Sequence, residues 1–300
     1  MHDLIIIGAG PAGITAAVYA SRKKMDFLVI SGDIGGQAAW SGDIENYTGY
    51  QFITGPELVS KFEEHMRKYA TVMKESELVL EIRKTGDKTV VKTDKGQYEC
   101  RTAIVASGKK SKELSVPGEK EFKNKGLTYC ATCDGPLFTG KDVAVIGGGN
   151  SALDAALQLM KIARHVYLIN IVSHLTGDPV MIEKVNASGI VTIMNNTKVL
   201  GIMGDKMVNA IKVKSDSEEK SVPVGGVFVE IGLIPNSHFA PDLAKNALGE
   251  ISVDRHNQTN IPGIFAAGDV TDVPEKQIII AAGEGAKASL SAFKYLNQHR

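Results

Sequence analysis

Apolar and glycine-rich stretches follow the same order in two places along this chain. Residues 3–23 (DLIIIGAGPAGITAAVYASRK) and residues 141–163 (KDVAVIGGGNSALDAALQLMKIA) each begin with an apolar run, continue through glycines and end in an alanine-rich segment. An unbroken apolar run indicates a strand buried on both faces, and the alanine-rich segment favours a helix. Each stretch therefore predicts a buried strand, a glycine turn and a helix.

A second short apolar run follows each of these stretches. It is FLVI at residues 27–30 in the first case and VYLIN at residues 166–170 in the second. Strand, helix and strand in this order form a βαβ unit with a parallel sheet. The chain therefore predicts an α/β fold with two doubly wound, Rossmann-like dinucleotide-binding domains.

Each predicted domain also contains a candidate antiparallel meander. Residues 55–70 place apolar side chains on one helical face, and residues 78–107 then alternate polar and apolar positions around the turns Gly86-Asp87 and Lys95-Gly96. Residues 199–224 predict a second meander in the other domain.

Two linker-like segments mark the points where the chain passes between the domains. They are KKSKELSVPGE at residues 109–119 and GLIPNSHFAPD at residues 232–242. Two crossings mean that the second domain is inserted into the first. We expect residues 1–112 and 242–300 to form one domain and residues 113–241 to form the inserted domain.

The composition is that of an ordinary globular protein. Hydrophobic residues make up 43% of the chain, and 34 basic side chains balance 34 acidic ones, so no long-range field attracts nucleic acid or an anionic membrane. No apolar run approaches the roughly 18 residues needed to cross a bilayer, and the N-terminus MHDLIIIGAG lacks the features of a signal peptide. We expect a cytoplasmic protein with neither nucleic acid nor membrane as a partner.

The glycines of the first turn, Gly8, Gly10 and Gly13, fit the dinucleotide-binding fingerprint for physical reasons. The first permits the tight turn, the second lets backbone approach a pyrophosphate, and the third allows close packing of helix on strand. The anion then lies at the helix N-terminus. The position of the turn directly after an apolar strand favours a nucleotide site over an ordinary strand–helix turn.

Two of the three cysteines, Cys130 and Cys133, form a C-x-x-C motif. This spacing can supply half of a zinc site, a structural crosslink or a reactive dithiol. A reducing compartment argues against a structural disulfide. A closed zinc site needs about four ligands, whereas only Cys100 remains and no paired-histidine motif is present. We expect no metal site and a core thiol at Cys100, and two unreactive core thiols stay the alternative to a redox pair.

Four further motifs carry a family resemblance. GIFAAGDV at residues 263–270 resembles the second flavin motif of the two-dinucleotide-domain flavoproteins, in which an Asp, here Asp269, bonds the ribityl chain of FAD. GGQ at residues 35–37, ENYTG at residues 45–49 and KQIII at residues 276–280 narrow the match. Together with CATCDGP in the second domain, the whole chain resembles the low-molecular-weight thioredoxin reductase family, close to the flavoprotein half of alkyl hydroperoxide reductase.

This resemblance implies an FAD-dependent oxidoreductase, a homodimer, that reduces the disulfide of a thioredoxin-like protein. Residues 1–112 and 242–300 are then the two parts of the FAD-binding domain, and residues 113–241 form a pyridine-nucleotide-like domain. The residues implied in cofactor binding are Gly8, Gly10, Pro11, Ala12, Gly13, Gly35, Gly36, Gln37, Asn46, Gly268, Asp269, Lys276, Gln277 and Ile278.

The resemblance also assigns roles to the redox motif. Cys133 is implied to exchange electrons with the flavin, Cys130 to attack the partner's disulfide and Asp134 to move the proton. General thiol chemistry requires such a pair, because the thiolate is the nucleophile and the mixed disulfide must be resolved by a neighbouring thiol. The family moves its dithiol between flavin and partner by rotating the inserted domain about the two linkers, and we expect the same here.

The sequence departs from the family at the site for the electron donor. NADPH-using members carry a His-Arg-Arg segment after the second strand of the inserted domain, which binds the 2'-phosphate. Residues 166–183 contain neither Arg nor Lys, and Asn170 stands where an NADH enzyme would place Asp or Glu. We expect NADPH to be a poor donor, and NADH or a protein such as ferredoxin to supply the electrons.

A second class of function stays open at this stage, a flavin-binding redox sensor or interaction module without steady turnover. The C-x-x-C motif favours the enzyme. A sensor needs an output segment, whereas this sequence runs to KYLNQHR directly after its last expected helix.

Overall fold

The computed structural model describes residues 1–299 apart from residues 42, 45, 70, 216 and 217. The chain divides into two compact units, which we call unit 1 (Met1–Lys110 with Ile234–Arg300) and unit 2 (Ser111–Leu233). Two short strands, β9 (Lys109–Ser111) and β18 (Leu233–Pro235), pair with each other where the chain passes from one unit to the other. The expected boundaries, after residues 112 and 241, fall later along the chain.

Unit 1 is built on a seven-stranded mixed sheet. Its strands lie in the order β5 (Met73–Glu75), β2 (Phe27–Ser31), β1 (His2–Ile7), β8 (Gln97–Val105), β7 (Lys88–Thr93) and β6 (Val79–Thr85), and β19 (Ile264–Ala266) also pairs with β8. The pairs of β1 with β2 and β8 are parallel, whereas β6, β7 and β8 form an antiparallel meander. A separate antiparallel pair is formed by β3 (Asp43–Ile44) and β4 (Ile53–Thr54).

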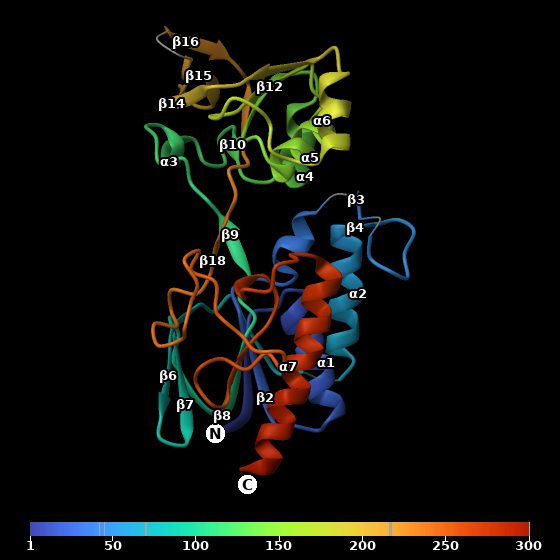
Figure 1. Cartoon of the computed structure of the whole chain (residues 1–300), viewed down its shortest axis with the longest axis vertical. Coiled ribbons are helices and arrows are strands. Elements are labelled where there is room, and N and C mark those ends of the chain that lie inside the picture. Colours follow the sequence, from blue (N-terminus) through green and yellow to red (C-terminus); the bar gives the residue numbers. More distant parts are fainter. Residues whose placement is uncertain (42, 45, 70, 216–217, 300) are drawn as a thin grey trace. The chain divides into compact units, whose positions relative to one another are not determined.

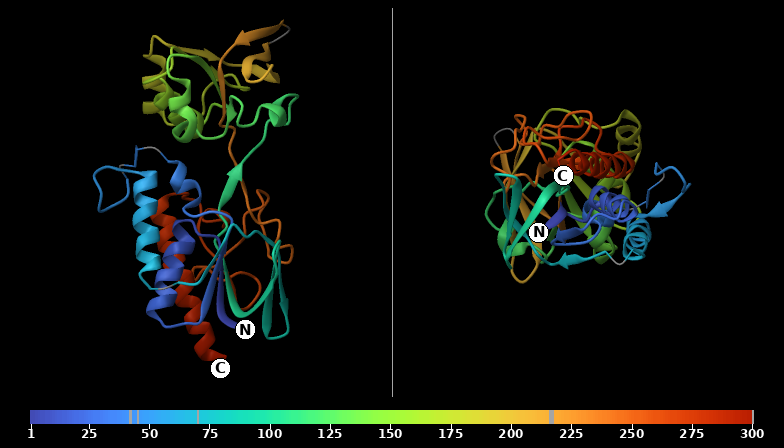
Figure 2. Two further views of the ribbon diagram at one scale, coloured as in Figure 1. Left: turned by 180° about the vertical axis from the view of Figure 1, so that it is seen from behind. Right: turned by 90° about the horizontal axis from the view of Figure 1, so that it is seen from below.

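Three helices of unit 1 lie side by side, as Figures 1 and 2 show: α1 (Pro11–Arg22), α2 (Gly55–Arg67) and α7 (Ile278–Gln298). Pro11 begins α1, where its missing N–H costs nothing. A capping box begins α2, because the Thr54 hydroxyl accepts a hydrogen bond from the Glu57 N–H and the Glu57 carboxylate accepts one from the Thr54 N–H.

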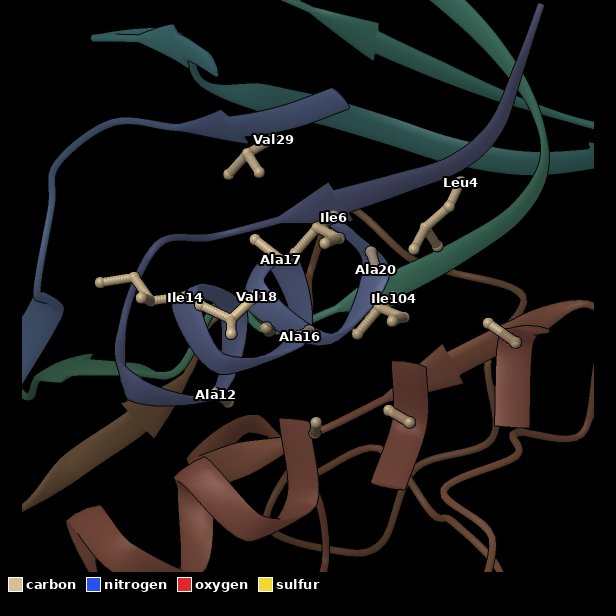
Figure 3. Close-up of a cluster of buried hydrophobic side chains, with 14 of the residues drawn as sticks. Leu4, Ile6, Ala12, Ile14, Ala16, Ala17, Val18, Ala20, Val29 and Ile104 are labelled. Carbon is tan, nitrogen blue, oxygen red and sulfur yellow. The ribbon is translucent and has the colours of Figure 1, made fainter. Parts of the chain in front are cut away.

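Residues 4–7 of β1 are apolar on both faces of the sheet because both faces are covered. Leu4 and Ile6 of β1 pack with α1, as Figure 3 shows, in a cluster that also includes residues of α7. Ile5 and Ile7 point to the opposite face, where they join a second cluster that includes Phe239. The alternation follows from the two-residue period of a strand. The unbroken apolar run therefore marks a strand between two layers.

Unit 2 is a second parallel sheet with its own helices and meander. Its strands lie in the order β10 (Leu127–Thr128), β17 (Gly226–Val229), β11 (Asp142–Ile146), β12 (His165–Ile169) and β13 (Val191–Met194). Its helices are α3 (Glu119–Phe122), α4 (Ala131–Asp134), α5 (Asn150–Leu159) and α6 (Pro179–Asn186). Its antiparallel meander consists of β14 (Thr197–Gly204), β15 (Val208–Ser215) and β16 (Glu218–Pro223).

The predicted fold class is confirmed, since the chain forms two Rossmann-like α/β units, each with an antiparallel meander, and unit 2 interrupts unit 1 in sequence. Within the part of the chain that the structure describes, no helix combines the length and the apolar character needed to cross a membrane.

Candidate functional site

The glycine turn of unit 1 leaves room for a ligand at one of its three glycines. Gly8 has a φ of +104°, and a β-carbon there would lie 2.3 Å from the Ala106 carbonyl oxygen. A β-carbon on Gly13 would lie 1.9 Å from the Gly8 carbonyl oxygen. Around Gly10, by contrast, the nearest atom is the Gly35 carbonyl oxygen at 3.9 Å. Gly10 is also the N-cap of α1 without a side-chain hydrogen bond, so the first N–H groups of α1 are left for an anion.

The GGQ segment packs against this turn. The Gly35 N–H donates to the Ala9 carbonyl at 2.7 Å, and a β-carbon on Gly36 would lie 3.7 Å from the Gly10 Cα. Gln37 Nε2 donates to the Lys109 carbonyl at 2.8 Å. The segment after β2 is thereby joined both to the glycine turn and to β9.

Ser31 at the end of β2 is a residue that sequence reasoning missed. Its buried hydroxyl accepts a hydrogen bond from the Ala9 N–H at 3.1 Å and donates to the Asp33 carbonyl at 2.6 Å. It therefore fixes the glycine turn to the segment that follows β2. Its position at the carboxyl end of a strand beside the fingerprint was the available signal.

The segment after β19 meets the N-terminus of α1. A β-carbon on Gly268 would lie 3.0 Å from the Ala12 β-carbon, and one on Gly285 of α7 would lie 2.0 Å from the Ala12 carbonyl oxygen. Both glycines thus permit a close approach that larger residues would prevent. Residues near the two ends of unit 1's sequence therefore share one site.

Asp269 is half-buried and accepts no hydrogen bond from any residue that the structure describes. Burial raises the pKa of its carboxyl, and the charges of Lys276 and Lys109 oppose this shift. An unused acceptor at the edge of a parallel sheet suits a ligand that carries hydroxyl groups.

The KQI segment at the start of α7 meets the segment that contains Asn46. Asn46 Nδ2 donates to Gln277 Oε1 at 3.0 Å, across 231 positions of sequence. Gln277 is the N-cap of α7 without a side-chain hydrogen bond to the helix, and Ile278 is the first helical residue. Lys276 Nζ donates to the Thr271 carbonyl at 2.5 Å. The structure therefore places the expected cofactor residues together in unit 1, although Glu45 of the ENYTG motif lies outside the described residues.

Lys109 and Glu250 form a largely buried ion pair beside the expected cofactor residues. The sequence alone predicted a role for neither of them. Lys109 Nζ lies 2.8 Å from Glu250 Oε1, with side-chain exposures of 13% and 8%. Lys276 Nζ lies 3.2 Å from the same oxygen, and Asn246 Nδ2 donates to the other oxygen at 2.7 Å. Burial raises the pKa of Glu250, but these hydrogen bonds outweigh it and hold the pKa at about 2. No local signal joins residues 141 positions apart in sequence.

The redox motif of unit 2 begins where β10 ends. The Thr128 hydroxyl donates to Asp134 Oδ2 and accepts a hydrogen bond from the Cys130 N–H at 3.2 Å. The Asp134 N–H donates to the Cys130 carbonyl at 3.2 Å. Thr128 therefore fixes the carboxylate of Asp134 beside the backbone of Cys130, a role that sequence reasoning missed although the residue lies two positions before the motif.

Cys130 is disulfide-bonded, whereas the side chain of Cys133 lies outside the described part of the chain. Cys100 is a free, buried thiol in β8. Burial raises its pKa to about 12, so it stays protonated and unreactive, as expected of a core thiol.

The glycine turn of unit 2 has the same geometry but different surroundings. Gly149 is the N-cap of α5, and the nearest atom to an added β-carbon is Thr176 Oγ1 at 3.9 Å. The Thr176 N–H donates to the Gly148 carbonyl at 2.7 Å, and the Asp178 N–H donates to Asn150 Oδ1 at 2.6 Å. The segment after β12 is therefore bonded to the glycine turn.

Asn170, at the position of the ribose-binding carboxylate, is committed to this same segment. Its amide Nδ2 donates to the carbonyls of Val172 and His174 at 3.1 and 2.7 Å and to Asn195 Oδ1 at 3.1 Å. The side chain is 3% exposed. Its amide protons are thus used inside the protein.

Glu230 follows β17 at the same edge of the sheet. The register pairs Thr128 of β10 with Phe228, and Val229 with Ile146, so Glu230 lies between the redox motif and the second glycine turn. Burial, and then the charge of Asp154, raises the pKa of Glu230 to about 8. It is therefore a neutral acid at pH 7, which sequence reasoning did not foresee.

Comparison with known proteins gives one family match over most of the chain. Residues 2–285 match the pyridine nucleotide-disulphide oxidoreductase family. A protein named NADH dehydrogenase from Ferdinandcohnia aciditolerans is 41% identical over 298 residues, and the F subunit of alkyl hydroperoxide reductase from Staphylococcus aureus is 41% identical over 299 residues. Each alignment covers 98% of this chain but only 57% and 59% of the relative, so the chain spans less than two thirds of these relatives.

Solved structures match the chain over its whole length. A thioredoxin reductase from Lactococcus lactis is 34% identical with a TM-score of 0.92, and the match covers 99% of this chain and 100% of that one. A ferredoxin-flavin thioredoxin reductase from Clostridium acetobutylicum is 32% identical with a TM-score of 0.56, with 99% and 98% covered.

Proposed function

The chain belongs to the pyridine nucleotide-disulphide oxidoreductase family, and within that family we propose that it is an FAD-dependent thioredoxin-disulfide reductase. Electrons would pass from FAD in unit 1 through Cys130 and Cys133 to the disulfide of a thioredoxin-like protein. The observation that carries the proposal is the convergence in unit 1 of an uncapped helix N-terminus, room above Gly10 and an unused acceptor at Asp269.

These features fit FAD group by group. The N–H groups at the start of α1 would bind the pyrophosphate, and the missing side chain of Gly10 would let it approach the backbone. Asp269 would accept hydrogen bonds from the ribityl hydroxyls. The GGQ segment and the start of α7 would hold the ring system. When bound, FAD supplies a carrier for two electrons.

The dithiol would reduce its partner by thiol–disulfide exchange. The Cys130 thiolate attacks one sulfur of the partner's disulfide, a mixed disulfide forms and the other partner sulfur leaves as a thiolate. Cys133 then attacks Cys130 Sγ, which restores the disulfide of the motif and releases the second partner thiolate. Asp134, held by Thr128, would give up or take the proton that this exchange requires.

The electron donor that we propose is NADH or a ferredoxin-like protein. The name of the Ferdinandcohnia aciditolerans relative supports NADH, and the name of the Clostridium acetobutylicum reductase supports ferredoxin. NADPH is disfavoured, because neither Arg nor Lys occurs from the start of β12 to Glu183. The internal hydrogen bonds of Asn170 weaken the case for either nucleotide.

Anaerobic titration of the flavin spectrum tests this proposal. The purified protein should be yellow, or should take up one FAD, and reduced ferredoxin or NADH should bleach the oxidised flavin band. Addition of an oxidised thioredoxin should restore that band in repeated cycles. A protein that takes up no FAD contradicts the proposal, and flavin reduction without any transfer to thioredoxins favours the redox sensor instead.

A homodimer and a cytoplasmic location follow from resemblance and sequence alone, and both stay predictions. Light scattering of the FAD-bound protein measures the mass that decides the first, against 32.1 kDa for one chain.

A further inference from the structure

Lys109 reaches the candidate flavin site with both its backbone and its side chain. It belongs to β9, at the boundary between the two units. Its carbonyl accepts a hydrogen bond from Gln37 Nε2 at 2.8 Å, and its ammonium lies 2.8 Å from Glu250. The next residue, Lys110, is exposed. This alternation is that of a strand, so only the first of the two lysines faces the site.

Glu250 links Lys109 to the segment that precedes α7. Its carboxylate is 8% exposed and also binds Lys276 at 3.2 Å. A buried carboxylate depends on its partners, because the loss of one leaves charge without compensation. The pKa of about 2 keeps Glu250 ionised at neutral pH, so the interaction persists under working conditions. Lys109 and Lys276 are therefore held by one carboxylate.

The chain passes between the units in two crossing segments, residues 107–112 around β9 and residues 232–236 around β18. The second crossing segment is bonded to the first at residues that precede β9. The Ser107 hydroxyl donates to the Asn236 carbonyl at 2.7 Å, and Asn236 Nδ2 donates back to the Ser107 carbonyl at 2.9 Å. The Asn236 N–H also donates to the Gly108 carbonyl at 2.9 Å. The two crossing segments thus join unit 1 as one bonded pair, and Lys109 is the member of that pair whose side chain pairs with Glu250.

We propose that Lys109 and Glu250 are positioning residues that couple FAD binding to the stiffness of the two crossing segments. This inference rests on the proposed function and on the rotation of the inserted domain about its two linkers, which the family resemblance implies. FAD would order Gln37 and Lys276, and each of them holds Lys109, directly or through Glu250. Coupling between two sites is reciprocal. If bound FAD stabilises the ordered state of the two crossing segments by some factor, disorder of these segments must weaken FAD binding by the same factor.

The test compares the FAD-bound wild-type protein with four variants. K109M and E250Q each remove one partner of the Lys109–Glu250 ion pair. K110M is the matched control, and K109R is the conservative variant that keeps the charge. Two quantities are measured: the FAD dissociation constant, and hydrogen exchange of the amides of Lys112 and Asn236 at half-saturating and saturating FAD. These amides donate across the crossing and back to unit 1, at 2.9 Å in both cases.

We expect K109M and E250Q to weaken FAD binding about tenfold, the equivalent of roughly 1.4 kcal/mol, which a charge-assisted hydrogen bond can supply. In wild type, saturating FAD should slow exchange at the crossing, and in K109M it should not. K110M should match wild type, and K109R should restore most of the coupling. Amides of β1 report whether each variant is folded, and if K109M is not, E250Q decides by the same two measurements.

Three results contradict the inference. If FAD-bound K109M and K110M have the same FAD affinity and the same hydrogen exchange, the proposed coupling is wrong, whereas the proposed function stands. FAD-dependent protection that survives in E250Q also overturns it. A wild-type protein that binds no FAD overturns the proposed function, and this inference with it.

Discussion

The two glycine turns of this chain are alike in backbone and differ in their surroundings. Gly8 and Gly147 have φ angles of +104° and +143°, and the following helices have Gly10 and Gly149 as N-cap residues without a side-chain hydrogen bond. At both N-caps the nearest atom to an added β-carbon lies 3.9 Å away. Backbone geometry alone would therefore assign both turns to the same ligand.

The side chains around the turns give a different answer for each unit. In unit 1 the edge of the sheet presents an unused acceptor at Asp269, whose carboxyl feels the charges of Lys276 and Lys109. In unit 2, Thr176 bonds the segment after β12 to the turn, Asn170 bonds to the backbone of that same segment, and Glu230 adds a neutral acid. The same fold therefore supplies the place for a nucleotide in both units, whereas the residues after the strands decide what binds there.

Loss of Cys130 should have the largest effect and separates the two units most clearly. In Cys130→Ser, thioredoxin reduction should fall below about one thousandth of wild type, because the attacking thiolate is gone. FAD content should not change, since the flavin residues lie in unit 1. Turnover with thioredoxin and the flavin absorbance measure the two quantities.

Cys100→Ala is the matched control, because this thiol is buried and its pKa is raised to about 12. It should keep its turnover with only a modest loss of stability. Normal thioredoxin reduction by Cys130→Ser would show that the roles assigned to the motif are wrong.

The second prediction breaks the symmetry of the two turns with one substitution in each. Gly10→Val should weaken FAD binding by more than about a hundredfold, equivalent to roughly 2.7 kcal/mol, because the side chain fills the space that a pyrophosphate needs. Gly149→Val should leave FAD binding unchanged. Both variants lose a glycine N-cap, which costs about 1 kcal/mol, so thermal unfolding should be shifted to a similar extent.

Flavin fluorescence during dilution measures the affinity in each variant. Equal FAD affinity in Gly10→Val and wild type would mean that the first turn does not hold the pyrophosphate. Equal weakening by both substitutions would mean that the effect is one of folding.

The third prediction concerns the donor. The protein should bind NADPH at least about a hundredfold more weakly than a family member with the His-Arg-Arg segment does. The reason is that two charged hydrogen bonds to the 2'-phosphate, of roughly 1.5 to 3 kcal/mol each, are missing. Stopped-flow reduction of the flavin at increasing NADPH measures this. Fast, saturable reduction by micromolar NADPH would contradict the prediction.

A gain of function sharpens the same point. Ile171 and Val172 directly follow Asn170 and are 67% and 44% exposed, so arginines there should be tolerated. The double variant Ile171→Arg, Val172→Arg should bind NADPH more tightly and leave reduction by ferredoxin unchanged. Val72 and Leu80, 59% and 53% exposed and outside the candidate flavin site, offer a matched pair of control positions in unit 1.

The smallest predicted effect concerns Glu230 and pH. Its pKa is about 8 in the folded chain, above the ordinary value of 4.5 that it regains on unfolding. Between these values the folded chain binds more protons, so stability falls as pH rises. Glu230→Gln removes this loss. Relative to wild type, the variant should gain about 2 °C or more in Tm at pH 8.5 and little at pH 5.

Thermal unfolding at several pH values measures this difference, and Glu121→Gln, an exposed change in unit 2, is the control. A gain in Tm that is the same at both pH values would show that Glu230 is not buried as a neutral acid.

Local sequence patterns predicted the helices and strands of both units, because each of these elements depends on interactions between residues close in the chain. An apolar run such as residues 4–7 needs a layer on each face, and the glycines after it follow from steric contact with neighbouring backbone. The meander turns at Gly86 and Gly96 could likewise be read from the sequence. The redox spacing was equally visible, although its role came from resemblance.

The sequence by itself determined the two βαβ units, the insertion of one domain into the other and the absence of Arg and Lys from residues 166–183. Only the tertiary structure decided which side chains pair across the sheet edge, such as Lys109 with Glu250 and Asn46 with Gln277. The physical reason is that periodicity and steric limits act between near neighbours in the chain. Pairing of distant side chains depends instead on strand order and on the packing of every layer between them.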